Sequence, residues 1–282
     1  TLIERGEQMA KVKSGYVEVA KGVELFYREA GSGIPIVFVP GWTFSSAVFE
    51  RQLEQLSGVH RVIAVDPRGQ GNSTKVAVGN SYNTHGHDLG VFLEKLGIER
   101  PVLVGWSTGC LEAYAMVRAH GTGKLAGFIG IDMSFKALSS SADDWVEGSI
   151  EEVAEVSTEL LGTVEGQRAF VEMYAKEVMI QRELTQEELD WVTGDSLKTP
   201  TWAALALWGN AMLSDYSKEA ATMDREVPSL YVLAEHWADT AKPFLTKHMP
   251  NTGTRVLGGH MMFWEHAQKF NALVDEFVKG LG

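Results

Sequence analysis

Residues 101–110, Pro-Val-Leu-Val-Gly-Trp-Ser-Thr-Gly-Cys, decide the fold of this chain. They open with a short, valine-rich apolar run that is typical of a buried strand, and residues 108–120 continue with a helical pattern. Between the two lies Gly105-Trp-Ser-Thr-Gly109, a G-x-S-x-G sequence. The chain has 29 glycines in 282 residues, so the motif alone arises by chance in about one such chain in five. Its place between a strand and a helix makes it informative.

In that setting the motif forms a sharp turn that lifts a serine hydroxyl above the edge of a sheet. Gly105 and Gly109 have no Cβ, so the strand and the helix can approach closely while Ser107 holds an unfavourable backbone conformation. Ser107 is therefore the candidate nucleophile. The alternative is an ordinary strand-to-helix loop with an exposed serine.

Short apolar runs alternate with stretches of helical period along the rest of the chain, which is typical of a mostly parallel sheet with crossover helices. Expected strands are residues 23–30, 35–40, 61–66, 101–106, 125–132, 227–235 and 254–257. Expected helices are residues 46–56, 85–96, 108–120 and 240–248, followed by an amphipathic stripe of Phe270, Leu273, Val274, Phe277 and Val278.

Between residues 134 and 226 the strand pattern disappears and about four helices are expected. Thr185-x-x-Glu188 is a capping box, and Thr199-Pro200 places an N-cap before a proline. We therefore expect an α/β core formed by residues 1–133 and 227–282, and a helical cap formed by residues 134–226.

Acidic residues outnumber basic ones, 37 to 25, which gives a formal net charge of −12. Residues 134–226 hold seven basic and 19 acidic residues and so carry the whole imbalance. These charges are either the solvated outer faces of the cap helices or a field that disfavours anionic ligands. We expect no nucleic-acid partner, because phosphate backbones would be repelled.

A single cysteine, Cys110, excludes an internal disulfide, and no apolar run approaches the roughly 20 residues of a spanning helix. We therefore expect a soluble protein without a membrane partner, located in the cytoplasm. The chain begins at Thr1, so a removed leader is the alternative, and Met9 is a further candidate for the native start.

A serine hydroxyl is a poor nucleophile until a base removes its proton, so we expect a histidine on a later loop at the same edge of the sheet. Of the eight histidines, His260 fits, because it follows the last expected strand through Gly258-Gly259 and precedes the final helix. His85 and His87 lie beside Asp88, but residues two apart on a helix point to different faces. We therefore expect no metal site.

Four segments together form a recognisable pattern: Pro40-Gly41-Trp42, Asp66-Pro-Arg-Gly-Gln-Gly-Asn-Ser73, the Gly105–Gly109 motif, and Gly258-Gly259-His260 with Phe263-Trp264-Glu265 behind it. They make nearly the whole chain similar to the α/β-hydrolase superfamily, and within it to small-cap serine esterases, haloperoxidase-like perhydrolases and enol-lactonases. The resemblance implies an eight-stranded, mostly parallel sheet with helices on both faces and a helical cap insertion. It also implies that backbone N–H groups of Trp42 and Thr108 form an oxyanion hole, although relatives usually have His-Gly where this chain has Pro40-Gly41.

The resemblance leaves the acid that orients the histidine open. In most relatives the acid follows the strand after the cap, which points to Asp239, with Glu235 as a weaker candidate in the same stretch. Only 21 residues separate Asp239 from His260, fewer than the family usually has. In haloalkane dehalogenases and some lactonases the acid ends the strand after the nucleophile helix, which points to Asp132, 25 residues after Ser107. We favour Asp132 and keep Asp239 as the alternative.

The expected function is hydrolysis of a neutral, fairly apolar ester or lactone by a Ser-His-Asp triad, with no cofactor. Trp145, Trp202, Trp208 and Met261 are candidates for the substrate pocket, the alternative for the tryptophans being the packing of the cap helices. A ligand-binding receptor with little turnover and a C–C bond hydrolase remain alternatives, because the same fold hosts them. The sequence does not indicate an oligomeric state.

Overall fold

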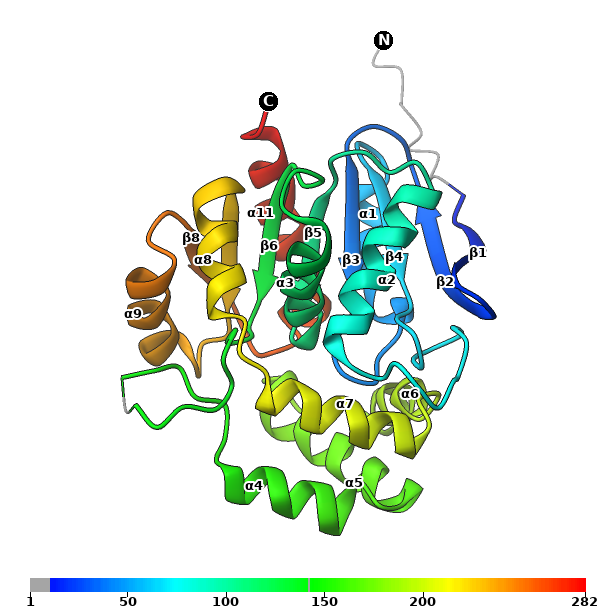
Figure 1. Ribbon diagram of the computed structural model, residues 1–282, viewed down its shortest axis with the longest axis vertical. Helices are drawn as coiled ribbons and strands as arrows, with labels where there is room; N and C mark the ends of the chain where they lie inside the picture. Colours follow the sequence, from blue (N-terminus) through cyan, green and yellow to red (C-terminus); the bar gives the residue numbers. More distant parts are fainter. Residues whose placement is uncertain (1–10, 142) are drawn as a thin grey trace.

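Eight strands form one continuous sheet through the middle of the molecule (Figure 1). They are β1 (Lys13–Ala20), β2 (Val23–Ala30), β3 (Pro35–Val39), β4 (Arg61–Val65), β5 (Val102–Trp106), β6 (Gly127–Ile131), β7 (Ser229–Leu233) and β8 (Gly253–Val256). The order across the sheet is β1-β2-β4-β3-β5-β6-β7-β8. Neighbours from β4 to β8 are parallel, whereas β1 and β2 pair antiparallel with each other and β2 pairs antiparallel with β4. The expected eight-stranded, mostly parallel sheet is confirmed.

The computed structural model describes residues 11–141 and 143–282. The two candidate starts of the native chain, Thr1 and Met9, lie outside the described residues. None of the helices within the described residues combines the length and the apolar character that crossing a bilayer requires.

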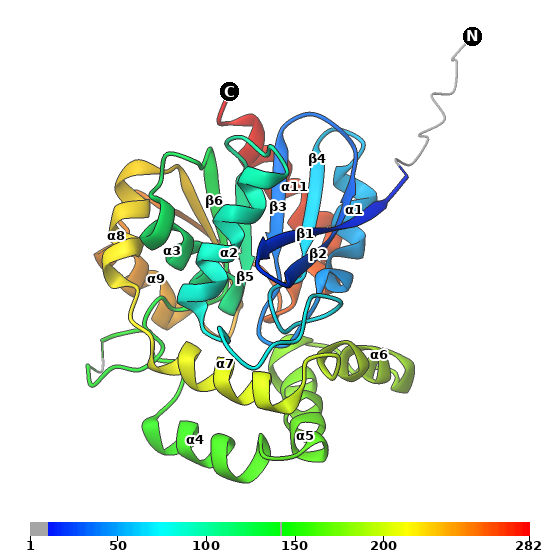
Figure 2. The ribbon, with the colours of Figure 1, turned by 45° about the vertical axis from the view of Figure 1, so that its right-hand side comes forward.

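The central strands β3 to β7 are buried on both faces, which explains why they are almost entirely apolar rather than alternating. Successive side chains of β3 point to opposite faces. Val37 and Val39 join the core under helices α2 (Tyr82–Lys95), α3 (Thr108–His120) and α8 (Ser217–Glu226), together with α9 (Ala238–His248). Ile36 and Phe38 join the core under α1 (Glu50–Leu56) and α11 (Ala267–Lys279) on the other face (Figure 2).

One helix start and one unpredicted strand differ from the sequence prediction for identifiable reasons. The helix predicted from residue 85 begins at Tyr82, because the Ser81 side chain caps it by accepting a hydrogen bond from the N–H of Thr84. The edge strand β1 had no predicted range of its own. Its inward residues Val17 and Val19 are buried, whereas Tyr16 is exposed, so its apolar pattern is weak.

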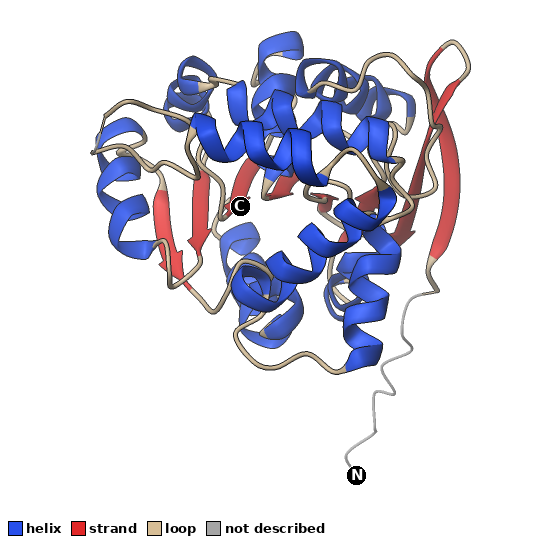
Figure 3. Cartoon of the chain, turned by 90° about the horizontal axis from the view of Figure 1, so that it is seen from below, coloured by secondary structure: helices blue, strands red, loops and turns tan. Residues whose placement is uncertain are grey.

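The cap helices lie across the carboxyl ends of the strands (Figures 1 and 3). They are α4 (Ile150–Glu155) with the π-helical turn Val156–Leu160, α5 (Val164–Tyr174) with the π-helical turn Ala175–Met179, α6 (Gln186–Ser196) and α7 (Thr201–Leu213). The expected capping box of Thr185 and Glu188 is present at the start of α6. Helix α8 falls inside the range assigned to the cap, but it packs against α3 and α9 (Figure 1), and we place it with the core.

The topology fixes where a site can form. β3 pairs with β4 on one side and with β5 on the other, so the chain leaves β3 and β5 in opposite directions and opens a crevice at their carboxyl ends. The loops after β3, β5, β6 and β8 all meet at this edge beneath the cap.

Two glycines in helices provide a matched test of the close packing at this edge. A Cβ on Gly109 in α3 would lie 2.4 Å from the carbonyl oxygen of Val39, whereas a Cβ on Gly209 in α7 would meet nothing within 4 Å. We expect Gly109→Ala to lower the free energy of unfolding by about 1–3 kcal/mol through overpacking. Gly209→Ala should raise it by up to about 1 kcal/mol through helix propensity. Urea denaturation of both variants checks this, and equal effects would contradict the packing argument.

Candidate active site

Ser107 occupies a strained turn between β5 and α3. Its backbone angles are φ 53° and ψ −125°, in a region that side-chain-bearing residues rarely adopt. The turn is held by the Ser107 N–H, which donates to the carbonyl of Ile131 at 2.8 Å. A Cβ on Gly105 would lie 2.6 Å from the carbonyl carbon of Gly109, so the strand and the helix touch through their backbones. The lack of side chains at both glycines is what permits this turn.

His260 and Asp132 form a buried pair. The Nδ1 atom of His260 lies 2.7 Å from Oδ2 of Asp132, and the two residues are 1% and 0% exposed. The second carboxylate oxygen of Asp132 accepts a hydrogen bond from the backbone N–H of Ala234 at 2.8 Å. Both oxygens are therefore occupied, and the carboxylate can hold the imidazole in the tautomer that carries its proton on Nδ1.

The other two acid candidates lie elsewhere. Asp239 is exposed in the first turn of α9, at the outer surface. Glu235 is also exposed and accepts a hydrogen bond from the Gln181 side chain at 2.8 Å. Of the three carboxylates, Asp132 is the one that the structure brings to His260.

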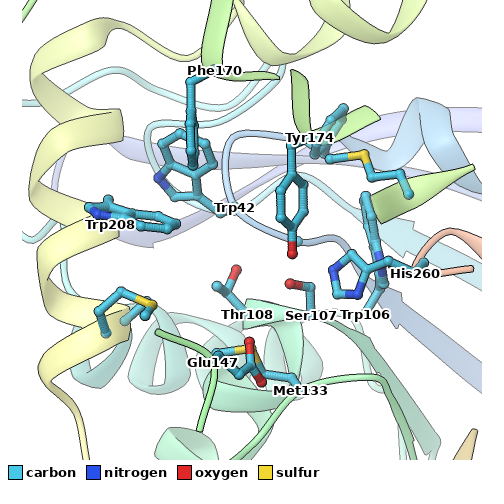
Figure 4. A pocket seen from close by; sticks show the side chains of 15 residues that line it. Trp42, Trp106, Ser107, Thr108, Met133, Glu147, Phe170, Tyr174, Trp208 and His260 are labelled. Atoms are coloured by element: carbon cyan, nitrogen blue, oxygen red, sulfur yellow. Dashed lines mark hydrogen bonds between the residues drawn. The ribbon is translucent and has the colours of Figure 1, made fainter. Parts of the chain in front are cut away.

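Ser107 and His260 line the same cavity under the cap (Figure 4). The view shows the serine hydroxyl beside the histidine ring, with the Tyr174 hydroxyl pointing toward both. The cavity has a volume of about 80 Å³. Its walls are mostly apolar and comprise Gly41, Trp42, Phe44, Trp106, Thr108, Met133, Glu147, Phe170, Tyr174, Met179, Trp208, Ala211 and Met212.

One of the four predicted pocket residues lines this cavity. Trp208 does so and packs against the rings of Trp42 and Phe170 at 5.5 and 5.2 Å. Trp202, on the outer side of the same helix, is 47% exposed. Trp145 and Met261 are fully buried in the core and are absent from the cavity wall. Residue type alone did not show which face of each segment would turn inward.

The loop after β3 is fixed in an unusual conformation beside Ser107. Thr43 has φ 67°, and Gln70 donates from its side chain to the carbonyls of Gly41 and Phe44 at 3.0 and 2.7 Å. Within the described residues, the backbone N–H groups of Trp42 and Thr108 donate to no protein acceptor. Both N–H groups are therefore free to bind a ligand oxygen.

The cap is tied to both loops that carry the site. Asp195 of α6 accepts hydrogen bonds from the N–H and the hydroxyl of Ser45 at 2.9 and 2.6 Å. On the other side, the N–H of His260 donates to the carbonyl of Val178 at 3.1 Å, and that of Met261 donates to Met179 at 2.9 Å. Sequence reasoning missed these contacts, because they join segments that are far apart in the chain.

Glu147 contributes a carboxyl group to the cavity wall, and no sequence motif marks it. One of its oxygens accepts a hydrogen bond from the Ser134 N–H. Burial, together with the negative charge of Asp132, raises the pKa of Glu147 to about 8, although the Ser134 N–H opposes the shift. Glu147 is therefore mostly protonated at neutral pH.

The histidines considered as metal ligands take other partners. Nδ1 of His85 lies 2.9 Å from a carboxylate oxygen of Glu112, and the ring of His87 stacks on that of His120. Among the residues that the structure describes, no group of three or more His, Cys, Asp or Glu side chains is arranged to hold a metal ion.

Comparison with known proteins places these features in a family. A family model described as the alpha/beta hydrolase fold matches residues 34–267. A non-heme haloperoxidase from Rhodococcus erythropolis is 39% identical over 112 residues, which are 39% of this chain and 41% of that protein. The chain thus matches about two fifths of the length of this relative.

Solved structures share the whole fold at low sequence identity. A bromoperoxidase from Bacillus anthracis superposes with a TM-score of 0.86 at 20% identity, covering 95% of this chain and 100% of the other. An esterase from Exiguobacterium antarcticum gives a TM-score of 0.81 at 20% identity, covering 94% and 98%. At this identity the likeness shows the fold.

The raised pKa of Glu147 predicts a dependence of stability on pH. Below about pH 4.5 the group is protonated in both states; between about 4.5 and 8 the unfolded chain loses the proton and the folded chain keeps it. Stability from this group therefore falls as the pH rises through that window. Relative to wild type, the free energy of unfolding of Glu147→Gln should be higher at pH 8 than at pH 5 by on the order of 2–4 kcal/mol. Urea denaturation at both pH values measures this difference, and parallel pH profiles would contradict a carboxyl group that stays protonated in the folded protein.

Proposed function

We propose that this chain, which belongs to the α/β-hydrolase family, is a serine hydrolase that cleaves a small neutral carboxylic ester or lactone through an acyl-enzyme. The observation that carries the proposal is the pairing of His260 with the fully buried Asp132 at 2.7 Å, in the cavity that Ser107 enters from its strained turn. A buried carboxylate on Nδ1 leaves Nε2 of the imidazole to act on the serine.

The proton path follows from these positions. Nε2 of His260 takes the proton of Ser107 as the serine oxygen attacks the carbonyl carbon, and the imidazolium then gives this proton to the leaving alcohol. A water molecule then attacks the acyl-enzyme, with His260 again taking and returning the proton, and the carboxylic acid is released. Asp132 keeps its negative charge throughout and stabilises the imidazolium.

The oxyanion of each tetrahedral intermediate needs hydrogen-bond donors that are already in place. We assign this role to the backbone N–H groups of Trp42 and Thr108. Gln70 and Asp195 hold the loop that carries Trp42, and Thr108 begins α3. Two rigid donors beside Ser107 support acyl transfer rather than simple ligand binding.

The lining of the cavity supports a small and neutral substrate. Its walls are mostly apolar, and none of the lining residues in the described chain is Lys or Arg, so a carboxylate on the substrate has no cationic partner. The acidic residues of the cap further disfavour the binding of an anionic substrate. The structural neighbour from Exiguobacterium antarcticum is an esterase, which agrees with ester hydrolysis.

Two carboxamide variants test the triad. We expect Asp132→Asn to lower kcat for a p-nitrophenyl ester by about 10³–10⁴-fold, because the histidine takes the wrong tautomer. Asp239→Asn changes an exposed carboxylate and should alter kcat less than twofold. Steady-state kinetics on folded protein measures both, and a comparable loss in the two variants would overturn the assignment.

A matched pair of esters tests the preference for neutral substrates. We expect kcat/KM for phenyl pentanoate to exceed that for the monophenyl ester of succinic acid, which has a carboxylate at a similar position, by at least about tenfold. Higher kcat/KM with the anionic ester would contradict this reading of the cavity.

A further inference from the structure

We propose that Glu147 determines substrate specificity: its carboxyl group donates a hydrogen bond to an oxygen acceptor next to the scissile ester bond. The pocket then selects esters that carry an ether, carbonyl or hydroxyl oxygen over plain alkyl esters of the same size. This inference rests on the proposed ester hydrolysis and names the class of ester.

Glu147 is placed in the cavity by the packing of its own segment. Trp145, two residues earlier, is fully buried and packs against Tyr231, Trp237 and Phe244 with ring centroids 6.3–6.5 Å away. The backbone N–H of Glu147 donates to the carbonyl of Ala137 at 2.9 Å. The segment is thus anchored two residues before Glu147 and at the backbone of Glu147 itself.

Only one oxygen of this carboxyl group has a protein partner within the described residues. Oε1 accepts the Ser134 N–H, and no hydrogen bond reaches Oε2. In Figure 4 the carboxyl group overlaps Met133 and lies below Ser107 and Thr108 in this view, and all four residues line the same cavity. A polar atom that lines an apolar cavity without a protein partner is a site for a ligand atom, because leaving it unpaired on ligand binding is costly.

The surroundings decide which ligand atom fits. The titratable groups coupled to Glu147 through their charges are Asp132, Tyr174, Cys110 and Tyr231, and His260 lines the same cavity. Desolvation of the carboxyl group, and to a smaller extent the negative charge of Asp132, disfavours the ionised form of Glu147 and raises its pKa to about 8. At neutral pH the group is therefore a donor, and it fits a neutral oxygen acceptor better than an ammonium group.

The same group gives the reaction an alkaline limit. Above about pH 8 the carboxyl group loses its proton and can no longer donate. Its negative charge then also lies beside the oxyanion that develops in the transition state, which opposes the reaction. With a pKa of about 8, the protonated fraction falls about tenfold between pH 7 and pH 9.

Isosteric ester pairs and three variants test the role. Phenyl methoxyacetate is compared with phenyl butyrate, and 2-methoxyethyl butyrate with butyl butyrate; each pair exchanges one methylene for an ether oxygen. We expect Glu147→Leu to lower the ether-to-alkyl ratio of kcat/KM about tenfold in at least one pair. Glu147→Gln keeps an N–H donor and should retain the ratio. Glu151→Gln, an exposed site on α4, is the control and should match wild type.

The pH dependence of kcat/KM separates this role from a merely structural one, which would leave the pH dependence unchanged. In wild type, kcat/KM for the preferred ether ester should fall about tenfold from pH 7 to pH 9, and in Glu147→Gln this fall should disappear. Retention of both ratios by Glu147→Leu, or persistence of the fall in Glu147→Gln, would overturn the inference. A preference of wild type for the phenyl ester of glycine that Glu147→Gln loses would also overturn it and assign an ammonium site instead.

Failure of the inference is distinguishable from failure of the proposed function. If wild type cleaves phenyl butyrate with a dependence on Ser107, while the Glu147 variants leave both ratios unchanged, the hydrolase assignment stands and the specificity role fails. If wild type cleaves none of the four neutral esters, ester hydrolysis fails as the proposed function, and the role of Glu147 fails with it.

Discussion

The contact of strand β5 with the start of helix α3 is the constraint on which the site depends. A Cβ on either Gly105 or Gly109 would press against backbone atoms, so the turn between them exists only with glycine at both positions. That turn holds Ser107 at a positive φ and directs its hydroxyl into the cavity under the cap. The strain is stabilised by the packing of a sheet that is buried on both faces, which supplies a rigid support for the loops around it.

The cap completes this support rather than merely covering it. Its α6 helix holds the loop after β3 through Asp195, and the turn after α5 holds the loop of His260 through the carbonyl of Val178. The side chain of Trp42 donates to the carbonyl of Ala204 at 2.8 Å and so links the loop after β3 to α7 as well. A movement of the cap would therefore shift both loops, and with them the proposed oxyanion-hole donors and the proposed base.

The sequence predicted the features that depend on local sequence patterns. It did not predict the side chains whose positions depend on packing against segments far away in the chain. The strand, glycine and helix pattern around Ser107 predicted its turn, and the Gly258-Gly259 step predicted the loop of His260. The choice between Asp132 and Asp239 stayed open, because carboxyl ends of parallel strands converge on one edge. Glu147 had no motif at all, since its place follows from the burial of Trp145. Trp202 and Trp208 differ only in the helix face that they occupy.

The central claim is that Ser107 is an activated nucleophile, and covalent labelling tests it without knowledge of the substrate. Intact-mass measurement after reaction with a fluorophosphonate probe should show a single adduct on wild type, mapped by peptide analysis to Ser107. Ser107→Ala should show none, and His260→Ala should label very slowly. A folded wild-type protein that acquires no adduct, or one that is labelled equally well after Ser107→Ala, would contradict the account.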